Sequence, residues 1–402
     1  MNRFKGLVLG LAILIGCTAE EDPILPVDRF TKIYDSEVFD ADFIPMDVQQ
    51  YFEGYIILAG RRQDGADFMG VTILLTDLEG NFVQKTDLQD NYIVPSPQLL
   101  STDDGYHFTC MESGSLVTQL VTIDRLTAEV GAPVSTGLTG YPLALSATAD
   151  GDVLLLTYNP EQRASVLSEL DVNANVQRTR SFTIGAGNDA LVAIVNHLTR
   201  EGSELPFFVG QTQEGNFYFN GLYNYTMSLV FTDLDSDAPL GVVQGQETHT
   251  GLYCALSLGE GQFAIASYSF NERFFQGQVA ISESGISATV GLEGNPIPEL
   301  DLNSHVEALS LSDNFLAFGA DSRDRQIMLY AYSKADGGLV GTQYYGFGLP
   351  YTFGGMSTTA DGGLIIAGSV YVADRFQRVA LIKLAEEDVN ALVLGTVVVD
   401  QE

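Results

Sequence analysis

The chain has 402 residues, of which 52 are acidic and 19 are basic, so its formal net charge at pH 7 is −33. This charge excludes nucleic acid as a partner, because nucleic-acid binding depends on Lys and Arg side chains that neutralise phosphates. It also argues against adsorption to anionic lipid headgroups. The 41 glycines and the many short apolar segments are typical of an all-β protein with many turns.

The first residues have the pattern of an export signal. Two basic residues precede an apolar run from Gly6 to Ile15, which is too short to span a bilayer as a helix. The run closes in Leu14-Ile15-Gly16-Cys17, which resembles the lipobox of bacterial lipoproteins. The resemblance implies that residues 1–16 are a signal peptide and that Cys17 carries the lipid. The alternative is an ordinary signal peptide followed by a chance cysteine.

An acidic cluster follows the cysteine, with Glu20, Glu21 and Asp22 in residues 17–29. It resembles the export signal of Bacteroidota surface lipoproteins. The resemblance implies that the protein is lipid-anchored on the outer membrane and faces the cell exterior. The alternative is a solvated tether, which acidic clusters commonly form. The next segment, residues 30–47, reads as a strand without a copy elsewhere, and we expect it to pair with the last repeat and close a ring.

A repeated unit fills residues 48–402. A turn with Asp, Asn or Gly is followed by a short apolar strand, and copies of this strand begin at Gly54, Gly105, Gly151, Glu204, Gly261, Asn314 and Gly362. About twenty residues further on, most copies have a second strand that ends in a turn, as at Asp77, Asp124, Asp171, Asp233 and Asp336. The copies are roughly 50 residues apart, which is typical of propeller blades.

The repeats predict an all-β fold, a single seven-bladed β-propeller, with six or eight blades as alternatives because the copies at Glu204 and Gly261 are weak. One four-stranded unit cannot bury both of its faces, whereas units stacked around an axis can. We expect the innermost strands just before the Gly turns, for example Leu143–Thr148, Leu252–Leu258 and Val306–Leu311. No helix longer than two turns is expected within the repeats.

The last copy has the clearest motif. Thr359-Ala360-Asp361-Gly362-Gly363 precedes Leu-Ile-Ile-Ala-Gly368, and a strand from Ala380 to Leu384 follows. This resembles the repeats of Bacteroidota lipoprotein propellers. The first copy matches nearly as well, and the fourth and fifth match poorly. The resemblance implies architecture and location, and little about a ligand.

The sequence contains no recognisable catalytic motif, so the catalytic residues are unknown. The four histidines, His107, His197, His249 and His305, are scattered. With Cys17 lipidated, Cys110 and Cys254 are expected to be buried free thiols, too far apart for a disulfide. A propeller could still assemble a pair of carboxylates on its axis, and a glycosidase needs only two.

One segment has carboxylates at alternating positions. Asp233, Asp235 and Asp237 resemble the start of an EF-hand loop, which would bind Ca²⁺. The pattern then departs, since Ala238 and Pro239 replace the glycine turn. A solvated turn is the favoured interpretation, and no other metal or cofactor is predicted.

Aromatic clusters are the candidate binding surface, because aromatic side chains on loops supply large, rigid contact areas. They comprise Phe217, Tyr218, Phe219, Tyr223, Tyr225, Phe274, Phe275, Tyr344 and Tyr345. The alternative is that they pack between blades. Because the chain has no Trp, a protein partner is favoured over a sugar.

These observations favour a non-catalytic surface lipoprotein that binds a protein or another macromolecule as an accessory of an outer-membrane complex. The protein would contact the membrane only through its lipid. Two alternatives stay open: a carbohydrate-active or other hydrolytic propeller, and a glycan-binding module that feeds an outer-membrane importer.

Overall fold

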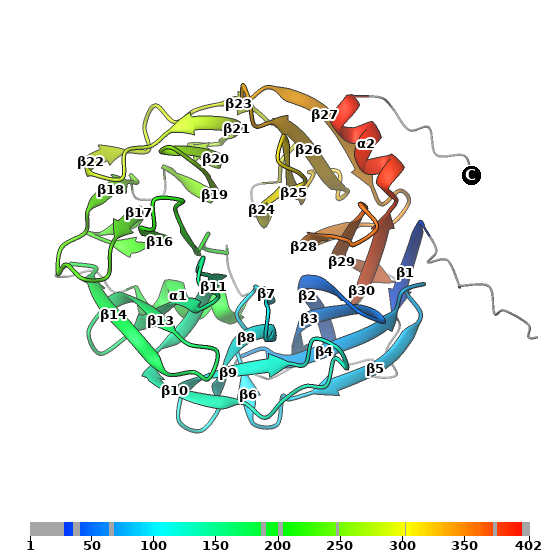
Figure 1. The fold of residues 1–402 in the computed structure, drawn as a ribbon, viewed down its shortest axis with the longest axis horizontal. Coiled ribbons are helices and arrows are strands. Elements are labelled where there is room, and N and C mark those ends of the chain that lie inside the picture. Colours follow the sequence, from blue (N-terminus) through cyan, green and yellow to red (C-terminus); the bar gives the residue numbers. More distant parts are fainter. Residues whose placement is uncertain are drawn as a thin grey trace, which may run out of the picture.

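The computed structural model describes residues 28–34, 41–63, 68–185, 190–199, 204–246, 249–301, 303–372 and 376–395. Cys17, Glu20, Glu21 and Asp22 therefore lie outside the described residues. The described strands form an all-β propeller, in which six hydrogen-bonded sheets surround one axis (Figure 1).

The largest sheet contains nine strands. They are β2 (Ala41–Tyr51), β3 (Gly54–Gln63), β4 (Gly70–Asp77), β5 (Phe82–Asp87), β6 (Tyr92–Ile93), β7 (Leu100–Thr102), β8 (Gly105–Glu112), β9 (Val117–Ile123) and β10 (Val134–Thr139).

The other five sheets have four or five strands each. One comprises β11 (Tyr141–Ala147), β12 (Val153–Asn159), β13 (Ala164–Leu170) and β14 (Val176–Thr183). The next contains β15 (Phe208–Gln211), β16 (Phe217–Tyr223), β17 (Thr226–Thr232), β18 (Gly241–Gln244) and β22 (Gly285–Ala288). Then come β19 (Thr250–Gly259), β20 (Gln262–Ser269), β21 (Glu272–Ala280) and β23 (Asn295–Pro296). The last two are β24 (Val306–Ser310), β25 (Phe315–Asp321), β26 (Ile327–Ser333) and β27 (Leu339–Tyr345), and β28 (Tyr351–Thr358), β29 (Leu364–Val372), β30 (Phe376–Leu384) and β1 (Phe30–Tyr34).

This arrangement corrects the predicted blade count. Five sheets have the size of one blade, whereas the sixth is continuous over nine strands, because β6 pairs with β4 on one side and with β8 on the other. The expected ring of seven separate four-stranded blades is therefore wrong, and rings of six or eight such blades do not fit either. The repeat pattern missed the connection because β6 has only two residues and no repeat motif.

The strands nearest the axis include β2, β11, β19, β24 and β28 (Figure 1). The prediction of innermost strands before the Gly turns is thus confirmed for β11, β19 and β24. The strand that comes before the turn of each repeat is called here its first strand, and the next two along the chain are its second and third strands. The first strands are β2, β7, β11, β15, β19, β24 and β28. Neighbouring first strands run in the same direction, since hydrogen bonds join them both near their middles and near their ends. Near the ends, Ala360 N donates to Gln50 Oε1 (2.7 Å) and Ala149 N to Gln211 Oε1 (2.6 Å). The hairpins that follow the first strands therefore gather at one end of the ring, called here the hairpin end.

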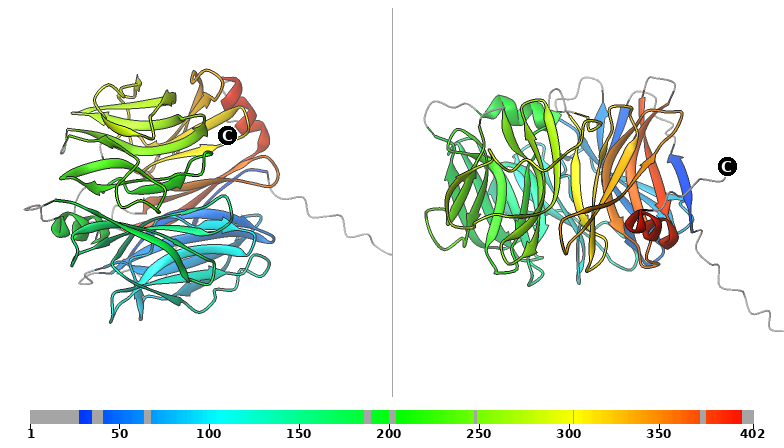
Figure 2. Two further views of the ribbon diagram at one scale, coloured as in Figure 1. Left: turned by 60° about the vertical axis from the view of Figure 1, so that its left-hand side comes forward. Right: turned by 90° about the horizontal axis from the view of Figure 1, so that it is seen from above.

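The N-terminal strand β1 pairs antiparallel with β30, so that the two ends of the described chain share one sheet. Arg29 extends this junction, because its Nε lies 2.6 Å from Asp388 Oδ2 in α2 (Glu386–Leu394). Helices α1 (Leu191–Thr199) and α2 lie at opposite ends of the ring (Figure 2). Nine residues make about two and a half turns, so the expectation of no helix longer than two turns is wrong for α1. None of the described helices is long and apolar enough to cross a membrane.

Alternate residues of the central strands pack against different neighbours. In β3, Ile56 and Leu58 face a cluster that includes Phe108, whereas Tyr55 and Ile57 face a cluster that includes strand β30. Both faces of the sheet are therefore apolar, which explains why these strands read as continuous hydrophobic runs instead of alternating ones.

Candidate functional site: the axial cavity

A cavity of about 390 Å³ lies on the axis, a size typical of ligand pockets. Its walls come from the first strands and from the segments that lead into them. The lining includes Asp47, Gln98, Glu204, Tyr253, Cys254 and Glu307. Neither Lys nor Arg occurs among the described residues that line it.

Side chains at the axis join one first strand to the next. Asp47 Oδ2 accepts a hydrogen bond from Leu99 N (2.7 Å), and Gln98 Oε1 accepts one from Leu145 N (2.9 Å). In the same way, Glu307 Oε2 accepts one from Met356 N (3.0 Å). The inner edge of a first strand has no further strand beside it, so its N–H groups need such acceptors.

Asp47 and Glu307 are brought together across a glycine. The strand of Met356 lies between them, and a Cβ atom added at Gly355 would lie 2.9 Å from Asp47 Cα and 3.1 Å from Asp47 Oδ1. Burial raises the pKa of both carboxyl groups, and the charge of Asp47 raises the pKa of Glu307 further. The backbone N–H donors oppose these shifts without reversing them.

A third carboxyl group, the half-buried Asp321, belongs to β25 but lies outside the cavity lining. Asp321 Oδ1 accepts a hydrogen bond from Phe353 N, which ties β25 to β28. Burial raises the pKa of Asp321 to about 8. The residue repeats the same device, a carboxyl group that receives a backbone N–H from the neighbouring sheet.

Two of the histidines are held by hydrogen bonds within their own surroundings. His107 is buried, with its ring nitrogens 2.9 Å from Thr102 Oγ1 and 3.0 Å from Thr122 Oγ1, and burial lowers its pKa. His197 Nδ1 accepts the Leu205 N–H (3.0 Å), and its ring lines the cavity together with His305.

Both remaining cysteines are buried free thiols, as predicted. Burial raises the pKa of Cys110 and of Cys254 to about 12. Cys254 lines the axial cavity, but a thiol with so high a pKa holds almost no thiolate and is a poor nucleophile.

Most of the predicted surface aromatics belong to the core. Phe217, Tyr218, Phe219, Phe274 and Phe275 are buried between the sheets, so the surface interpretation is wrong for these five. They lie on β16 and β21, whose two faces are both covered, and the polar residues around them misled the interpretation.

The other four predicted aromatics are at least partly accessible. Tyr223 is half-buried, and Tyr225 is 54 % exposed. Tyr344 and Tyr345 are half-buried along a second cavity of about 540 Å³, between β27 and the β1–β30 pair. The four residues thus lie in two separate places and do not form one surface.

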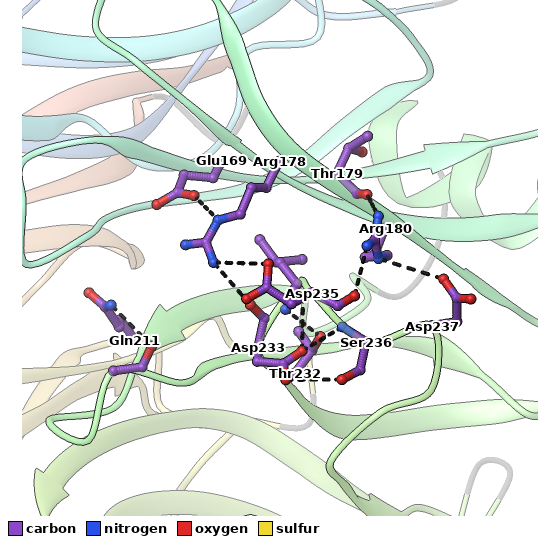
Figure 3. Close-up of polar contacts among 12 residues, drawn as sticks. Glu169, Arg178, Thr179, Arg180, Gln211, Thr232, Asp233, Asp235, Ser236 and Asp237 are labelled. Atoms are coloured by element: carbon purple, nitrogen blue, oxygen red, sulfur yellow. Dashed lines mark hydrogen bonds and ion pairs between the residues drawn. The ribbon is translucent and has the colours of Figure 1, made fainter.

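The Asp233 segment is a turn stabilised by its own backbone (Figure 3). Asp233 Oδ1 accepts hydrogen bonds from Asp235 N (2.9 Å) and Ser236 N (2.8 Å). Asp235 and Asp237 instead lie near arginines, with Oδ1 atoms 3.8 Å from Arg178 Nη1 and 3.9 Å from Arg180 Nε. The described residues contain no group of three His, Cys, Asp or Glu side chains that could hold a metal.

The repeat itself explains this turn. Asp77, Asp124 and Asp171 occupy the same place at the end of a third strand, and each accepts backbone N–H groups of its own turn. After β26 this place is taken by Ser333, whose Oγ accepts the N–H of Ala335. The resemblance to an EF-hand therefore comes from a repeated turn motif. Sequence reasoning missed the axial carboxyl groups, whose only signal is a polar residue within an apolar first strand.

Comparisons with known proteins find only distant similarities. No family model matches the chain, and no curated protein matches it. Among solved structures, the β-propeller domain of the Trilobed protease from Pyrococcus furiosus has 12 % identity and a TM-score of 0.49, with 90 % of this chain and 100 % of that chain covered. YCF48 from Cyanidioschyzon merolae has 11 % identity and a TM-score of 0.47, with 89 % and 99 % covered. Virginiamycin B lyase from Staphylococcus aureus has 10 % identity and a TM-score of 0.46, with 88 % and 100 % covered.

Proposed function

We propose that this chain is a lipid-anchored surface propeller without catalytic activity, which binds a basic protein surface as an accessory of an outer-membrane complex. The lipobox at Cys17 and the acidic residues Glu20, Glu21 and Asp22 support the anchor and the outward location.

The observation that carries the proposal is the charge of the hairpin end. Every described hairpin between a first and a second strand contains an exposed carboxylate, and none contains Lys or Arg. These carboxylates are Glu53, Asp103, Asp104, Asp150, Glu214, Glu260, Asp313 and Asp361. Asp361 is paired with Lys383, and Arg125 and Lys334 donate to carbonyl groups at two of the hairpins, so the carboxylates still outnumber the cations there. Such a surface favours a partner of opposite charge and speeds its association.

The anchored side of the ring is also the acidic side. The third strand β30 runs toward the hairpin end, where it leads into α2, and Arg29 is paired with α2. A lipid tether that enters here would turn the acidic hairpins toward membrane proteins beside the anchor. This arrangement suits an accessory of a membrane-embedded complex better than a receptor for distant ligands.

The test is affinity purification from the native membrane with two charge variants. One variant neutralises the hairpin end through Asp103→Asn, Asp104→Asn, Glu214→Gln and Asp313→Asn. The matched control neutralises four exposed carboxylates of other segments, Glu112→Gln, Glu161→Gln, Glu272→Gln and Asp324→Asn. We expect the wild type and the control to retain a membrane protein that the first variant loses. Equal retention by all three proteins would overturn the proposed surface.

The anchor and the location have separate tests. Cys17→Ser should abolish labelling by a lipid precursor and release the protein from the membrane. External protease should remove the wild type from intact cells, whereas a variant with Ala at positions 20, 21 and 22 should be protected. Membrane-bound Cys17→Ser protein, or a protected wild type, would contradict the anchor or the outward location respectively.

A second candidate, a hydrolytic enzyme, is favoured by one observation. Asp47 and Glu307 bring two carboxyl groups into one cavity, as acid–base hydrolysis of a glycosidic bond requires. A panel of aryl glycosides and aryl esters tests this candidate. Hydrolysis by the wild type that Glu307→Gln abolishes would replace the non-catalytic proposal.

A further inference from the structure

We propose that the axial cavity binds a basic side chain, the ammonium group of Lys or the guanidinium group of Arg, supplied by a polypeptide partner. This inference rests on the proposed function, because it names the chemical group through which the partner would enter the ring. It is carried by a lined cavity and by two carboxyl groups, the buried Asp47 and the half-buried Glu307, beside which the described lining contains no Lys or Arg.

The first step is the charge of the cavity. Asp47 is only 8 % exposed, and buried carboxylates are normally paired with a cation or a metal. The described lining contains Asp47, Glu204 and Glu307 but no Lys or Arg, and its other ionisable side chains are those of His197, His305, Tyr218, Tyr253 and Cys254. Among the described residues, no Lys or Arg side chain therefore lines this cavity beside Asp47 and Glu307.

The second step is the geometry that brings the two acids together. Asp47 belongs to β2 and Glu307 to β24, and β28 lies between them in the ring. At the crossing point β28 carries Gly355, whose missing side chain leaves the space next to Asp47 Oδ1. Each acid uses only part of its hydrogen-bonding capacity for the backbone, since Glu307 accepts the Met356 N–H, Asp47 accepts those of Val48 and Leu99, and a carboxylate has about four acceptor positions.

The lining of the cavity favours an organic cation over a metal ion. The described residues offer no three metal-ligating side chains in one place. The cavity is also far larger than a metal ion requires, and Leu143, Leu145 and Phe207 line part of it. A charged head among acceptors and an apolar stem along such walls is the arrangement that Lys and Arg prefer.

The lining of the cavity reaches toward the hairpin end of the ring. The lining extends to Ala147, Gln211 and Ser257, which lie near the ends of their first strands. These ends lead into the acidic hairpins, so a basic partner on the hairpin end would stand over the axis. A segment of such a partner that enters the ring from this end would carry a lysine or arginine toward the two acids.

The experiment uses the mature full-length protein and two matched probes. Nα-acetyl-lysine amide carries the ammonium group, and Nα-acetyl-norleucine amide has the same stem without it. Calorimetric titration should show that the wild type binds the lysine probe at least tenfold more tightly than the norleucine probe. Equal affinities for the two probes would overturn the inference.

Two variants connect this preference to the acids. Glu307→Gln should abolish the preference, while its amide oxygen still accepts the Met356 N–H and keeps the ring closed. Asp321→Asn is the matched control, since Asp321 is another half-buried carboxyl group that receives a backbone N–H but does not line the cavity. The control should keep the full preference, and an unchanged preference in Glu307→Gln would overturn the inference. Thermal melts of both variants verify that they are folded.

The outcome separates this inference from the proposed function. If the probes bind equally while a membrane protein still co-purifies with the wild type and is lost from the hairpin variant, only the cavity assignment fails. If the lysine probe is preferred while no partner depends on the hairpin carboxylates, the accessory role fails and the cavity assignment stands.

Discussion

Carboxyl groups occur in two settings in this ring, and in both they receive backbone N–H groups. Inside the ring, Asp47 on β2 and Asp321 at the end of β25 receive N–H groups from a neighbouring sheet or strand. In the third-strand turns, Asp124, Asp171 and Asp233 receive N–H groups from their own turn. The chemistry of the hydrogen bond is the same, and only the surroundings differ.

The two settings shift the pKa in opposite directions. Burial raises the pKa of Asp321 to about 8 although an N–H group points at it. A hydrogen bond from Asn175 lowers the pKa of Asp171, and one from the Thr127 backbone lowers that of Asp124. Desolvation therefore outweighs a backbone hydrogen bond inside the ring, and the hydrogen bond prevails where water covers the group.

The two groups of carboxyl groups therefore differ in their ionisation state. The turn carboxylates keep their charge near neutral pH and can present it to a partner. The carboxyl groups inside the ring, such as Asp47 and Asp321, resist ionisation unless a cation compensates their charge. Variants that crowd the axis, that neutralise a buried acid, or that remove a turn acid should thus have large, intermediate and small effects.

The largest effect is expected at the axis. Gly355→Val places a branched side chain where a Cβ atom alone would come within 2.9 Å of the Met46 carbonyl oxygen and of Asp47 Cα. Because backbone atoms cannot give way as a flexible side chain can, β28 and β2 must separate. We expect the free energy of unfolding to fall by about 3 kcal/mol, measured by urea denaturation.

The control for this variant is Gly114→Val. A Cβ atom at Gly114 meets nothing within 4 Å, so the change should stay within about 0.5 kcal/mol of the wild type. A Gly355→Val protein as stable as the control would show that the two axial strands are not in close contact.

An intermediate effect is expected for the pH dependence of stability. Between pH 4 and the raised pKa of about 8, folded Asp321 holds a proton that the unfolded chain releases. Stability must then fall as pH rises through this range, by at most about 1.4 kcal/mol per pH unit. In Asp321→Asn this contribution is lost, so relative to the wild type the variant should gain about 2 kcal/mol between pH 5 and pH 7.

Urea denaturation at several pH values measures this effect, with Asp313→Asn as the control. Asp313 lies in an exposed hairpin, so its amide variant should follow the wild-type profile. Parallel profiles for the wild type and Asp321→Asn would mean that Asp321 is not desolvated in the folded protein.

The sequence predicts the repeated parts of this molecule well because each repeat carries its own local signal. The last copy shows this, since Asp361 pairs with the buried Lys383 ammonium at 2.9 Å and fixes the turn that the motif implies. Local sequence patterns do not predict the burial of a residue when a neighbouring sheet, distant in the sequence, covers it. Phe217 and Phe219 look like a surface cluster, yet both faces of their strand are buried by adjacent sheets.

The axial site could not be predicted from the sequence for a related reason. Asp47 and Glu307 lie in distant repeats, and only the closure of the ring brings them near each other. Strand β6 and helix α1 were missed because they belong to connections between repeats, which carry no copy of the motif. A sequence without aligned relatives thus shows the unit of the ring, but not what the units enclose.

The smallest effect is expected for a turn carboxylate. Asp171 Oδ1 accepts hydrogen bonds from Asn173 N (2.9 Å) and Asn175 N (2.8 Å), so Asp171→Ala leaves these groups to water. The groups are exposed, and we expect calorimetry at pH 7 to show a decrease in Tm of no more than about 2 °C. The lowered pKa gives the sign of the pH dependence: the charge of Asp171 contributes stability above its ordinary pKa, and this contribution is lost as pH falls through the lowered value. The wild type and the variant should therefore converge in acid, whereas Asp237→Ala, which removes an exposed carboxylate without turn hydrogen bonds, should match the wild type throughout. A difference that grows as pH falls would mean that the neutral form of Asp171, and not its charge, holds the turn.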